Sequence, residues 1–395
     1  MFTPVFTSGK LKKMLPLLEE ISERVVSHIK KGSESDEDIE VKDLMGKFSM
    51  DALASCAFGV DSGSFTHKED TEFLKNAKKI FDFVNPWSIA KTLIAMFTHK
   101  TVKQFFHHLG FKNFATIANL KENEFFQNVV EASIKQRKES STRRNDLVDL
   151  MIDATEGKLE STEAHENTQN NLAALSECNT KTTKDISYDR VISTAGVLLL
   201  AGYDTTGTTM SYVIYELAMH QDHQDTLFEE IENAKNNSDG LSYDAIQSLP
   251  YLDAIIHETL RRHPVVSFIE RPCTKDYKLP NTDLVIKKGD VVRASNMGIC
   301  FDPDIFPNPE EWNPDNFSKE NRMNRSPYSF LAFSLGPRNC MAMRFAIFEM
   351  KVAVSHLVSK FKILTSPKTC RKVEVDPKHM LGAAKGGLYV KFEER

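Results

Sequence analysis

Residues 333–342 read Phe333-Ser334-Leu335-Gly336-Pro337-Arg338-Asn339-Cys340-Met341-Ala342. The Gly-Pro turn carries Cys340 to the start of an apolar helix that is predicted over residues 341–361. Backbone N–H groups and the positive end of the helix dipole favour a thiolate at such a place, and a thiolate suits a metal. A lone cysteine on an apolar helix is more often inert. The flanking residues favour the metal ligand, because Arg338 can reach an anionic group beside the metal and Phe333 can shield the sulfur.

Glu258 and Arg261 stand three residues apart on a predicted helix upstream of this stretch. At that spacing two opposite charges can pair along one face of the helix. A surface ion pair of this kind is common, so the motif alone is weak. Its position adds weight, because it leads into Arg262-His263-Pro264 and then into Glu270-Arg271-Pro272.

The longest nearly uncharged run, residues 191–215, is interrupted only by Asp204. Its length would suit a membrane span, but its threonines, its glycines and the single acid favour a long helix through the centre of a soluble domain. Asp204 and Thr205 form an acid–alcohol pair that is costly to bury without a purpose, and Gly202 can open space against a flat cofactor. A solvated or capping pair explains these residues equally well.

Together, these segments resemble the cytochrome P-450 family of haem-thiolate monooxygenases. The haem-binding loop of that family has the pattern F-x-x-G-x-R-x-C-x-G. The matching residues are Phe333, Gly336, Arg338 and Cys340. Ala342 departs from the final Gly. The family's E-x-x-R motif resembles residues 258–261, and its A-G-x-[DE]-T box resembles residues 201–205.

The resemblance implies a role for each matched residue. Cys340 is the expected axial ligand of the haem iron, with a thiolate that favours O–O cleavage. Arg338 and Arg271 are expected at the haem propionates. The other expected cofactor contacts are Phe333, Gly336 and Ala201. Thr205 is expected to hold dioxygen and its water over the distal haem face while Asp204 helps to relay protons, and this pair favours oxygen activation over the haem-thiolate isomerases that lack it.

The family also places an arginine in a P-E-R-F-like box that completes a triad with the E-x-x-R pair. Here the box reads Pro314-Asp315-Asn316-Phe317. Asn316 can donate a hydrogen bond but brings no charge. We therefore expect the Glu258 carboxylate to be met by Arg261 or by backbone groups.

Residues 4–12 and 49–59 look like the animal microsomal clan that oxidises drugs, xenobiotics and steroids. By the same resemblance, substrate contacts come from the residues that follow the E-x-x-R helix, which are Val265, Val266, Ser267 and Phe268. Further contacts are expected around Leu200 and in a phenylalanine-rich stretch, residues 81–126, for which core packing is the plainer explanation. Their apolar character suits lipophilic small molecules.

The chain holds no G-x-G-x-x-G or other nucleotide loop, so its electrons would come from another protein. For microsomal members that partner is the NADPH-dependent flavoprotein reductase, and O2 is the second substrate. The candidates for a basic docking patch are Lys10, Lys12, Lys13 and Arg344, with merely solvated lysines as the alternative. The resemblance implies the cytosolic face of the endoplasmic reticulum membrane. It also implies N-terminal truncation, because the anchor, a small sheet and a W-x-x-x-R helix are missing upstream of Met1.

Composition agrees with a mainly helical domain. Lys and Arg number 50 and Asp and Glu number 55, and the net charge of −5 removes nucleic acid as the default partner. Only 17 glycines argue against glycine-rich hairpins and phosphate loops. Six cysteines without C-x-x-C or finger spacing indicate neither a zinc site nor a disulfide framework.

The expected fold is the mainly α, two-lobed cytochrome P-450 fold over residues 1–395, one haem domain with a long central helix over the haem and a small β-rich region. Apolar spacing predicts a helix from residue 9 to about residue 32, with Pro16 as a kink or a late start. Further helices are expected over residues 42–57, 135–153 and, in two stretches, 242–263. Residues 156–185 are expected to form an exposed, partly disordered loop. The expected strands cover residues 284–292, as strand, turn and strand, and residues 386–392.

Two competing interpretations remain. The first is a truncated haem-binding or non-binding fragment without turnover, because the missing N-terminal elements would leave one haem edge open. The second is a cysteine hydrolase that uses Cys340, which lacks a histidine or an acid placed by motif to activate it.

Overall fold

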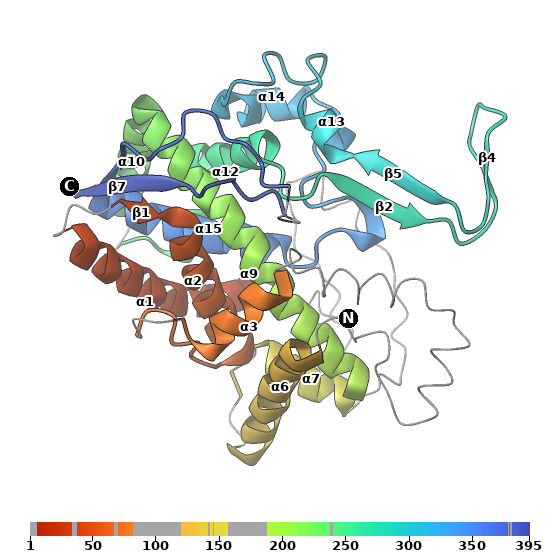
Figure 1. Ribbon diagram of the computed structural model, residues 1–395, viewed down its shortest axis with the longest axis horizontal. Coiled ribbons are helices and arrows are strands. Elements are labelled where there is room, and N and C mark those ends of the chain that lie inside the picture. The colour runs from red at the N-terminus through yellow and green to blue at the C-terminus, as the bar shows by residue number, and fades with distance from the viewer. Residues whose placement is uncertain are drawn as a thin grey trace.

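The central feature of the fold is α9 (Tyr188–Met219), a long helix that runs through the middle of the computed structural model (Figure 1). The structure describes residues 6–33, 38–66, 70–81, 120–140, 143–144, 146–156, 188–237, 240–377, 379 and 381–395. Leu199, Val213 and Leu217 of α9 have no exposed surface. The sequence of α9 is apolar on most sides, so its described part can be enclosed by other helices. The predicted long central helix is confirmed.

Helices from both halves of the chain surround α9. Those of the first half are α1 (Ser8–Ser33), α2 (Val41–Leu53), α3 (Glu72–Phe81), α6 (Leu120–Ser140) and α7 (Leu147–Thr155). Those of the second half are α10 (Gln221–Asn236), α11 (Tyr243–Gln247), α12 (Pro250–Arg262), α13 (Asn296–Cys300), α14 (Lys319–Met323) and α15 (Met343–Lys360). Short helical turns lie at Ala54–Phe58 (η2), Pro314–Phe317, Pro327–Ser329 and Gly336–Arg338. The mainly α class is therefore confirmed.

Helix α1 buries the apolar face that its spacing predicts. The buried residues of that face include Leu11, Leu15, Leu18, Ile21, Val25 and Ile29. The helix begins at Ser8 and contains Pro16, so the expectation of a late start at Pro16 is wrong. The buried face supplies the packing that outweighs the one backbone hydrogen bond that a proline removes.

Helices α2 and α9 cross so closely that glycine is needed at the contact. A Cβ atom added to Gly207 would lie 3.0 Å from Gly46 Cα and 3.3 Å from Met45 O. Gly202 faces the same helix, because its added Cβ would meet Leu53 Cδ1 at 2.5 Å. The expectation that Gly202 opens space for a flat cofactor is thus wrong, since Gly202 serves the packing of α9 on α2.

Gly207→Ala is expected to lower the free energy of unfolding by about 1–3 kcal/mol, because the added methyl group meets backbone that cannot rotate away. Gly196→Ala on the same helix is the matched control, since its added Cβ meets nothing within 4 Å. The control is expected to stabilise the chain by up to about 1 kcal/mol through helix propensity. Urea denaturation followed by circular dichroism measures both, and equal midpoints for the two variants would contradict the close crossing.

Within the described residues, the strands form three small antiparallel sheets, and all strands but β1 come from residues 268–394. One sheet has the strand order β1 (Ile39–Glu40), β7 (Tyr389–Glu394), β6 (Phe361–Thr365). The others pair β2 (Phe268–Pro272) with β5 (Val291–Ser295), and β3 (Tyr277–Lys278) with β4 (Val285–Ile286). The predicted strands over 284–292 and 386–392 are thus present. However, β4 and β5 do not pair with each other, because each pairs with a strand earlier in the chain.

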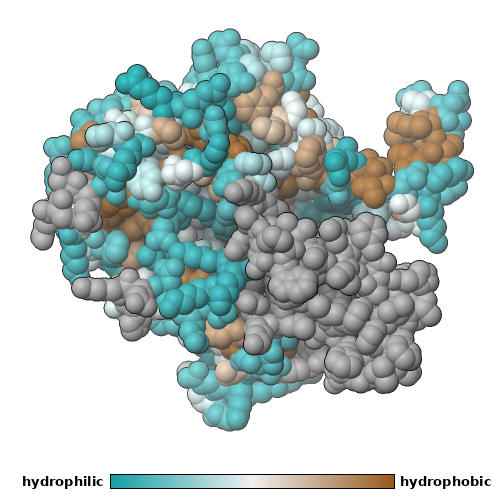
Figure 2. Space-filling view, viewed as in Figure 1, coloured by the Kyte–Doolittle hydropathy of each residue, from teal (hydrophilic) through white to brown (hydrophobic). Residues whose placement is uncertain are grey.

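Strands β2 to β5 form an arm that projects from the helical body (Figure 1). Hydrophobic side chains gather on this arm (Figure 2). Its exposed apolar residues include Tyr277, Leu284, Val285 and Val291.

Some expected elements differ from the structure. The helix expected over residues 135–153 is the end of α6 followed by the separate α7, because Asp146 caps α7 by accepting from the Asp149 N–H at 3.2 Å. The expected loop over residues 156–185 lies outside the described residues apart from Glu156, and so does most of the phenylalanine-rich stretch. At the end of that stretch, Phe125 and Phe126 pack edge-on against Phe73. Across the described part of the chain, no helix has the length and apolarity to cross a bilayer.

A buried carboxylate ties the end of α9 to α10 and α12. Glu216 interacts with His220 and His263, and the His263 ring stacks on Tyr212 at 4.1 Å. Burial alone would raise the pKa of Glu216, but the hydrogen bonds and charge of the two histidines lower it from 4.5 to about 2. Burial lowers the pKa of His263, whereas the hydrogen bond with Glu216 raises that of His220. The contact with Glu216 therefore favours the protonated form of His220, whereas burial favours the neutral form of His263.

The lowered pKa of Glu216 predicts a pH-dependent stability. The contribution is complete above the unfolded pKa of 4.5 and is lost as pH falls toward about 2. We therefore expect wild type to be more stable than Glu216→Gln at pH 7 by a few kcal/mol, with the gap closing below pH 4.5. Chemical denaturation at pH 7, 5 and 3 measures the gap. A gap that stays constant over this range would contradict the assignment.

Candidate active site

The loop before α15 presents Cys340 at the protein surface. Cys340 is exposed, whereas Cys56 and Cys300 are buried. Its backbone N–H donates to Phe333 O at 2.8 Å, which closes the loop. Gly336 adopts a φ of 78° and Ser334 also has a positive φ, so the turn relies on left-handed backbone.

Ala342 replaces the expected glycine without backbone strain. It caps α15 with a φ of −100° and a ψ of 13°, which an L-residue can adopt. Its side chain packs on the main hydrophobic core. The departure from the motif is therefore accommodated by the fold.

The electrostatics of Cys340 differ from the expectation. Desolvation raises the pKa of the thiol, and the hydrogen bond from the Ala342 N–H lowers it only in part. Although the residue is exposed, the protein atoms around the loop are enough to desolvate the sulfur. The helix start alone thus does not hold a thiolate, and a bound cation would have to supply the remaining stabilisation.

Arg271 and Arg338 meet at this loop. Arg271 Nη2 donates to Ser334 Oγ at 3.0 Å and to Arg338 O at 3.1 Å. Both arginines are exposed, and neither has a carboxylate partner within the described ranges. Two exposed arginines at the Cys340 loop, without carboxylate partners in the described part of the chain, favour a ligand that carries negative charge.

Ala201 and Thr205 form an accessible stripe on α9. Ala201 is exposed, although Leu199 and Tyr203 on either side are buried. Thr205 Oγ1 donates to Ala201 O at 2.6 Å. Because this bond uses the single hydroxyl proton, Thr205 is left to accept hydrogen bonds from a group bound at the stripe.

Asp204 is buried next to this stripe, with 3% of its surface exposed. Its Oδ1 accepts a short hydrogen bond from Lys42 Nζ of α2. His379 Nδ1 lies 4.0 Å from its Oδ2. Sequence reasoning identified Asp204 but missed Lys42 and His379, which stand far away in the chain and carry no local motif.

The E-x-x-R pair is fully buried and links α12 to the loops after α13. Arg261 donates to both oxygens of Glu258, at 2.7 and 2.8 Å. Burial raises the pKa of Glu258, and Arg261 lowers it in part. The Asn313 N–H and Asn316 Nδ2 also donate to Glu258 Oε1, at 2.8 and 3.2 Å. As expected, Asn316 donates a hydrogen bond to Glu258, and Arg261 and a backbone N–H stabilise the Glu258 carboxylate. The sequence did not predict Arg325, a nearby cation that packs on Phe306 at 4.3 Å.

The segment after α12 presents two of its apolar side chains to solvent. Val266 and Phe268 are 41% and 49% exposed, and Val265 is buried. Ser267 is partly buried, and its carbonyl accepts the Met297 N–H at 3.2 Å.

The alternation along β2 separates two predicted site residues. Residues 268 and 270 share one face of the strand, and Arg271 lies on the other. The Arg293 guanidinium covers the Phe268 ring at 4.9 Å and pairs with Glu270. Phe268 therefore lies on the face of β2 opposite to Arg271, which contacts the Cys340 loop.

Three of the predicted basic residues lie near the start of α1, and the fourth, Arg344, lies at the start of α15. Arg344 Nη2 donates to Ser8 Oγ, and Lys12 pairs with Asp244 at 2.8 Å. Desolvation lowers the pKa of Lys10. Lys13 is exposed. Arg344 stands four residues after Cys340, so this surface adjoins the candidate site.

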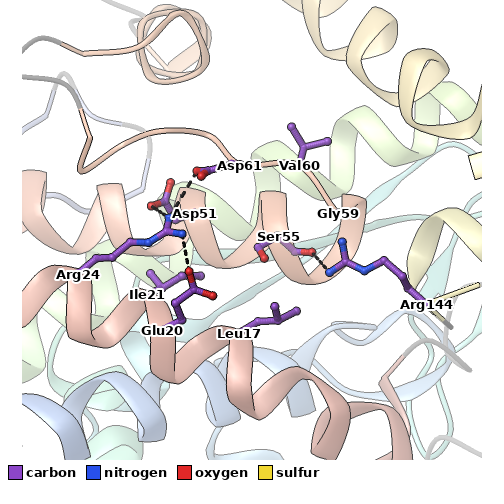
Figure 3. A pocket seen from close by; sticks show the side chains of 10 residues that line it. All are labelled: Leu17, Glu20, Ile21, Arg24, Asp51, Ser55, Gly59, Val60, Asp61 and Arg144. Carbon is purple, nitrogen blue, oxygen red and sulfur yellow. Dashed lines mark hydrogen bonds and ion pairs between the residues drawn. The ribbon is translucent and has the colours of Figure 1, made fainter. Parts of the chain in front are cut away.

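A separate pocket of about 200 Å³ lies between α1, α2 and η2 (Figure 3). Arg24 lies among three acids in it, 2.8 Å from Glu20, 3.5 Å from Asp61 and 3.9 Å from Asp51. None of the predicted site residues lines this pocket. Arg24 already interacts with all three acids, which is typical of a structural ion cluster.

Comparison with known proteins identifies the family. The family model of Cytochrome P450 matches residues 1–392. The chain belongs to the cytochrome P450 family. Cytochrome P450 6B1 of Papilio polyxenes is 35% identical, over 100% of this chain and 74% of the relative. Cytochrome P450 3A12 of Canis lupus familiaris is 33% identical, over 95% of this chain and 68% of the relative.

Family membership settles the cofactor and the class of enzyme. Cytochrome P450 proteins are oxidoreductases, monooxygenases that hold haem through a cysteine thiolate. The similarity to insect and mammalian members confirms the resemblance to the animal clan. The residues present fit this cofactor, because an exposed cysteine, two uncompensated arginines and an accessible helix stripe are what a flat, anionic iron porphyrin requires.

Proposed function

We propose that this cytochrome P450 inserts one atom of O2 into lipophilic small molecules such as xenobiotics, steroids or fatty-acid-like compounds. The observation that carries the proposal is the contact of Arg271 with the loop that holds Arg338 and the exposed Cys340, where neither arginine has a carboxylate partner among the described residues. Family membership supplies the class of reaction.

The haem-holding residues follow from this arrangement. Cys340 would ligate the iron, Arg338 and Arg271 would bind the two propionates, and Phe333 and Gly336 would shape the loop around the sulfur. Ala201 would border the opposite side of the cofactor. When bound, a thiolate-ligated haem supplies the reductive activation of dioxygen.

On the distal side the chain itself handles hydrogen bonds and protons. Thr205 Oγ1 is committed to Ala201 O, so Thr205 accepts a hydrogen bond from a protonated group in the site. Asp204 lies one position earlier and is held by Lys42, which fixes its carboxylate while leaving Oδ2 for proton exchange. Thr205 thus orients the bound group, and Asp204 supplies protons.

The substrate class follows from the exposed apolar side chains near the site. Val266 and Phe268 expose apolar side chains to solvent, whereas Val265 is buried and Ser267 is partly buried. Burial of such surface against an apolar molecule is favourable. We therefore assign residues 265–268 to the recognition of lipophilic compounds.

Electrons would come from an NADPH-dependent flavoprotein reductase. Arg344 is exposed four residues after Cys340, and Lys13 is exposed on α1, which packs on α15, so these cations support docking of an acidic partner near the site. We further propose the cytosolic face of the endoplasmic reticulum membrane as its location, by analogy with the microsomal clan.

Oxygen-18 labelling tests the function. The haem-loaded chain is supplied with reductase, NADPH, a lipophilic probe such as lauric acid or testosterone, and ¹⁸O2. One labelled oxygen atom in the product is the expected result. A chain that binds haem but yields no labelled product with a panel of such probes would support haem binding without turnover.

A further inference from the structure

Asp204 carries one carboxylate oxygen that the described structure leaves unsatisfied. Its Oδ2 is buried and has no hydrogen-bond partner among the described residues. His379 Nδ1 lies 4.0 Å away and is also buried without a partner in that part of the chain. Buried polar atoms are almost always paired. Asp204 Oδ2 and His379 Nδ1 lie close together and both lack a partner among the described residues, which points to a shared function.

The fold holds His379 in this place. Its N–H donates to Asp376 O at 3.0 Å, and the Asp376 N–H donates to Ala383 O at 2.8 Å, so the residue belongs to the turn of a hairpin. The hairpin is fixed to α9, because Tyr212 Oη donates to Gly382 O at 2.7 Å. The His379 side chain is 30% exposed, whereas that of Asp204 is 4% exposed. One part of the imidazole thus faces solvent while Nδ1 faces the buried acid.

We propose that His379 exchanges protons between solvent and the Asp204 carboxyl, which supplies the distal site beside Thr205. This inference rests on the proposed function. The neutral imidazole with its hydrogen on Nδ1 takes up a proton from solvent at Nε2, and the imidazolium so formed releases its Nδ1 proton to Asp204 Oδ2. Exchange with water then restores the Nδ1–H tautomer, and no electron is transferred. A shift of about 1 Å brings the two atoms within hydrogen-bond distance. His379 touches neither cofactor nor substrate, so it is a positioning residue that acts through Asp204.

The surrounding charges suit this exchange. Lys42 neutralises Asp204 from α2 whether or not the imidazole is charged. The other titratable groups nearby are Asp43 of α2, Tyr203 of α9, Asp70 before α3 and Asp376 of the hairpin. Asp43 is occupied by Lys47 and Lys78, each at 2.7 Å. Histidine is the residue type of this group whose ordinary pKa lies near neutral pH.

The first test uses the full chain and needs no turnover. The ¹⁵N NMR signals of the His379 imidazole are recorded, with assignment from His379→Gln. Asp204→Asn is expected to move the Nδ1 signal, because it replaces the carboxylate that lies 4.0 Å from this nitrogen. Lys385→Gln, an exposed change on the same hairpin, is the matched control and is expected to leave the signal in place. An unchanged Nδ1 signal in Asp204→Asn would overturn the proposal.

The second test uses the haem-loaded chain with reductase, NADPH and a lipophilic probe. His379→Gln is expected to lower the share of NADPH electrons recovered in product on the order of tenfold, and to increase the D2O isotope effect on turnover. Lys385→Gln is expected to change neither. Wild-type values for both readouts in a folded His379→Gln chain would overturn the relay. If wild type fails to bind haem through a thiolate, the proposed function fails, and the NMR measurement separately decides whether His379 and Asp204 interact.

Discussion

Arg261→Ala is expected to lower the free energy of unfolding by about 3–5 kcal/mol, which is a large share of the stability of an ordinary domain. Arg261 has no exposed surface and donates to both oxygens of Glu258. It also donates to the backbone carbonyls of Cys300 at the end of α13 and of Pro309 and Glu311 in the loop that follows. Its removal leaves the buried Glu258 carboxylate without its counter-ion and three backbone carbonyls without this hydrogen-bond donor.

Urea denaturation followed by circular dichroism measures this effect. Arg262→Ala is the matched control, because Arg262 is partly exposed and its guanidinium pairs with Glu310 at 3.4 Å. The control is expected to cost less than about 1 kcal/mol. Arg261→Lys keeps the charge but loses the forked geometry, and an intermediate loss is expected. Equal unfolding midpoints for Arg261→Ala and Arg262→Ala would contradict the structural role of the pair.

Cys340→Ser is expected to abolish oxygen insertion while the chain still folds. The serine side chain has nearly the same shape, and the backbone hydrogen bond from residue 340 to Phe333 O does not involve the sulfur. A serine hydroxyl stays protonated at neutral pH, so the electron donation of a thiolate is lost. Product formation with ¹⁸O2 is expected to fall to background.

Cys273→Ser is the control for this substitution, because Cys273 is partly exposed and lies on the β-rich arm between β2 and β3. It is expected to keep wild-type turnover. Loss of turnover in Cys273→Ser together with wild-type turnover in Cys340→Ser would contradict the choice of ligand.

Short-range spacing predicted much of this fold. The apolar spacing of α1 and the uncharged run of α9 follow from burial on a helix, which depends on residues three to four positions apart. The pair of Glu258 and Arg261 was predictable for the same reason, since both stand on one turn of α12. The hydrogen bond from Asn316 to Glu258 was anticipated because the donor type was known once the box had been located.

Features that depend on distant segments were not predictable. The partners of Asp204 come from α2 and from the hairpin near the C-terminus, and neither belongs to a motif. The role of Gly202 depends on where Leu53 packs. The raised pKa of Cys340 depends on how many protein atoms surround the loop, which outweighs the effect of the helix start. These properties arise from tertiary packing, which local sequence does not determine.

The carbon monoxide difference spectrum of the reduced, haem-supplemented chain tests the central claim most directly. We predict a Soret band of the thiolate-ligated type in wild type, and its loss in Cys340→Ala. A wild-type chain that takes up no haem, or a thiolate-type band that persists in Cys340→Ala, would contradict the assignment of Cys340 as the haem ligand.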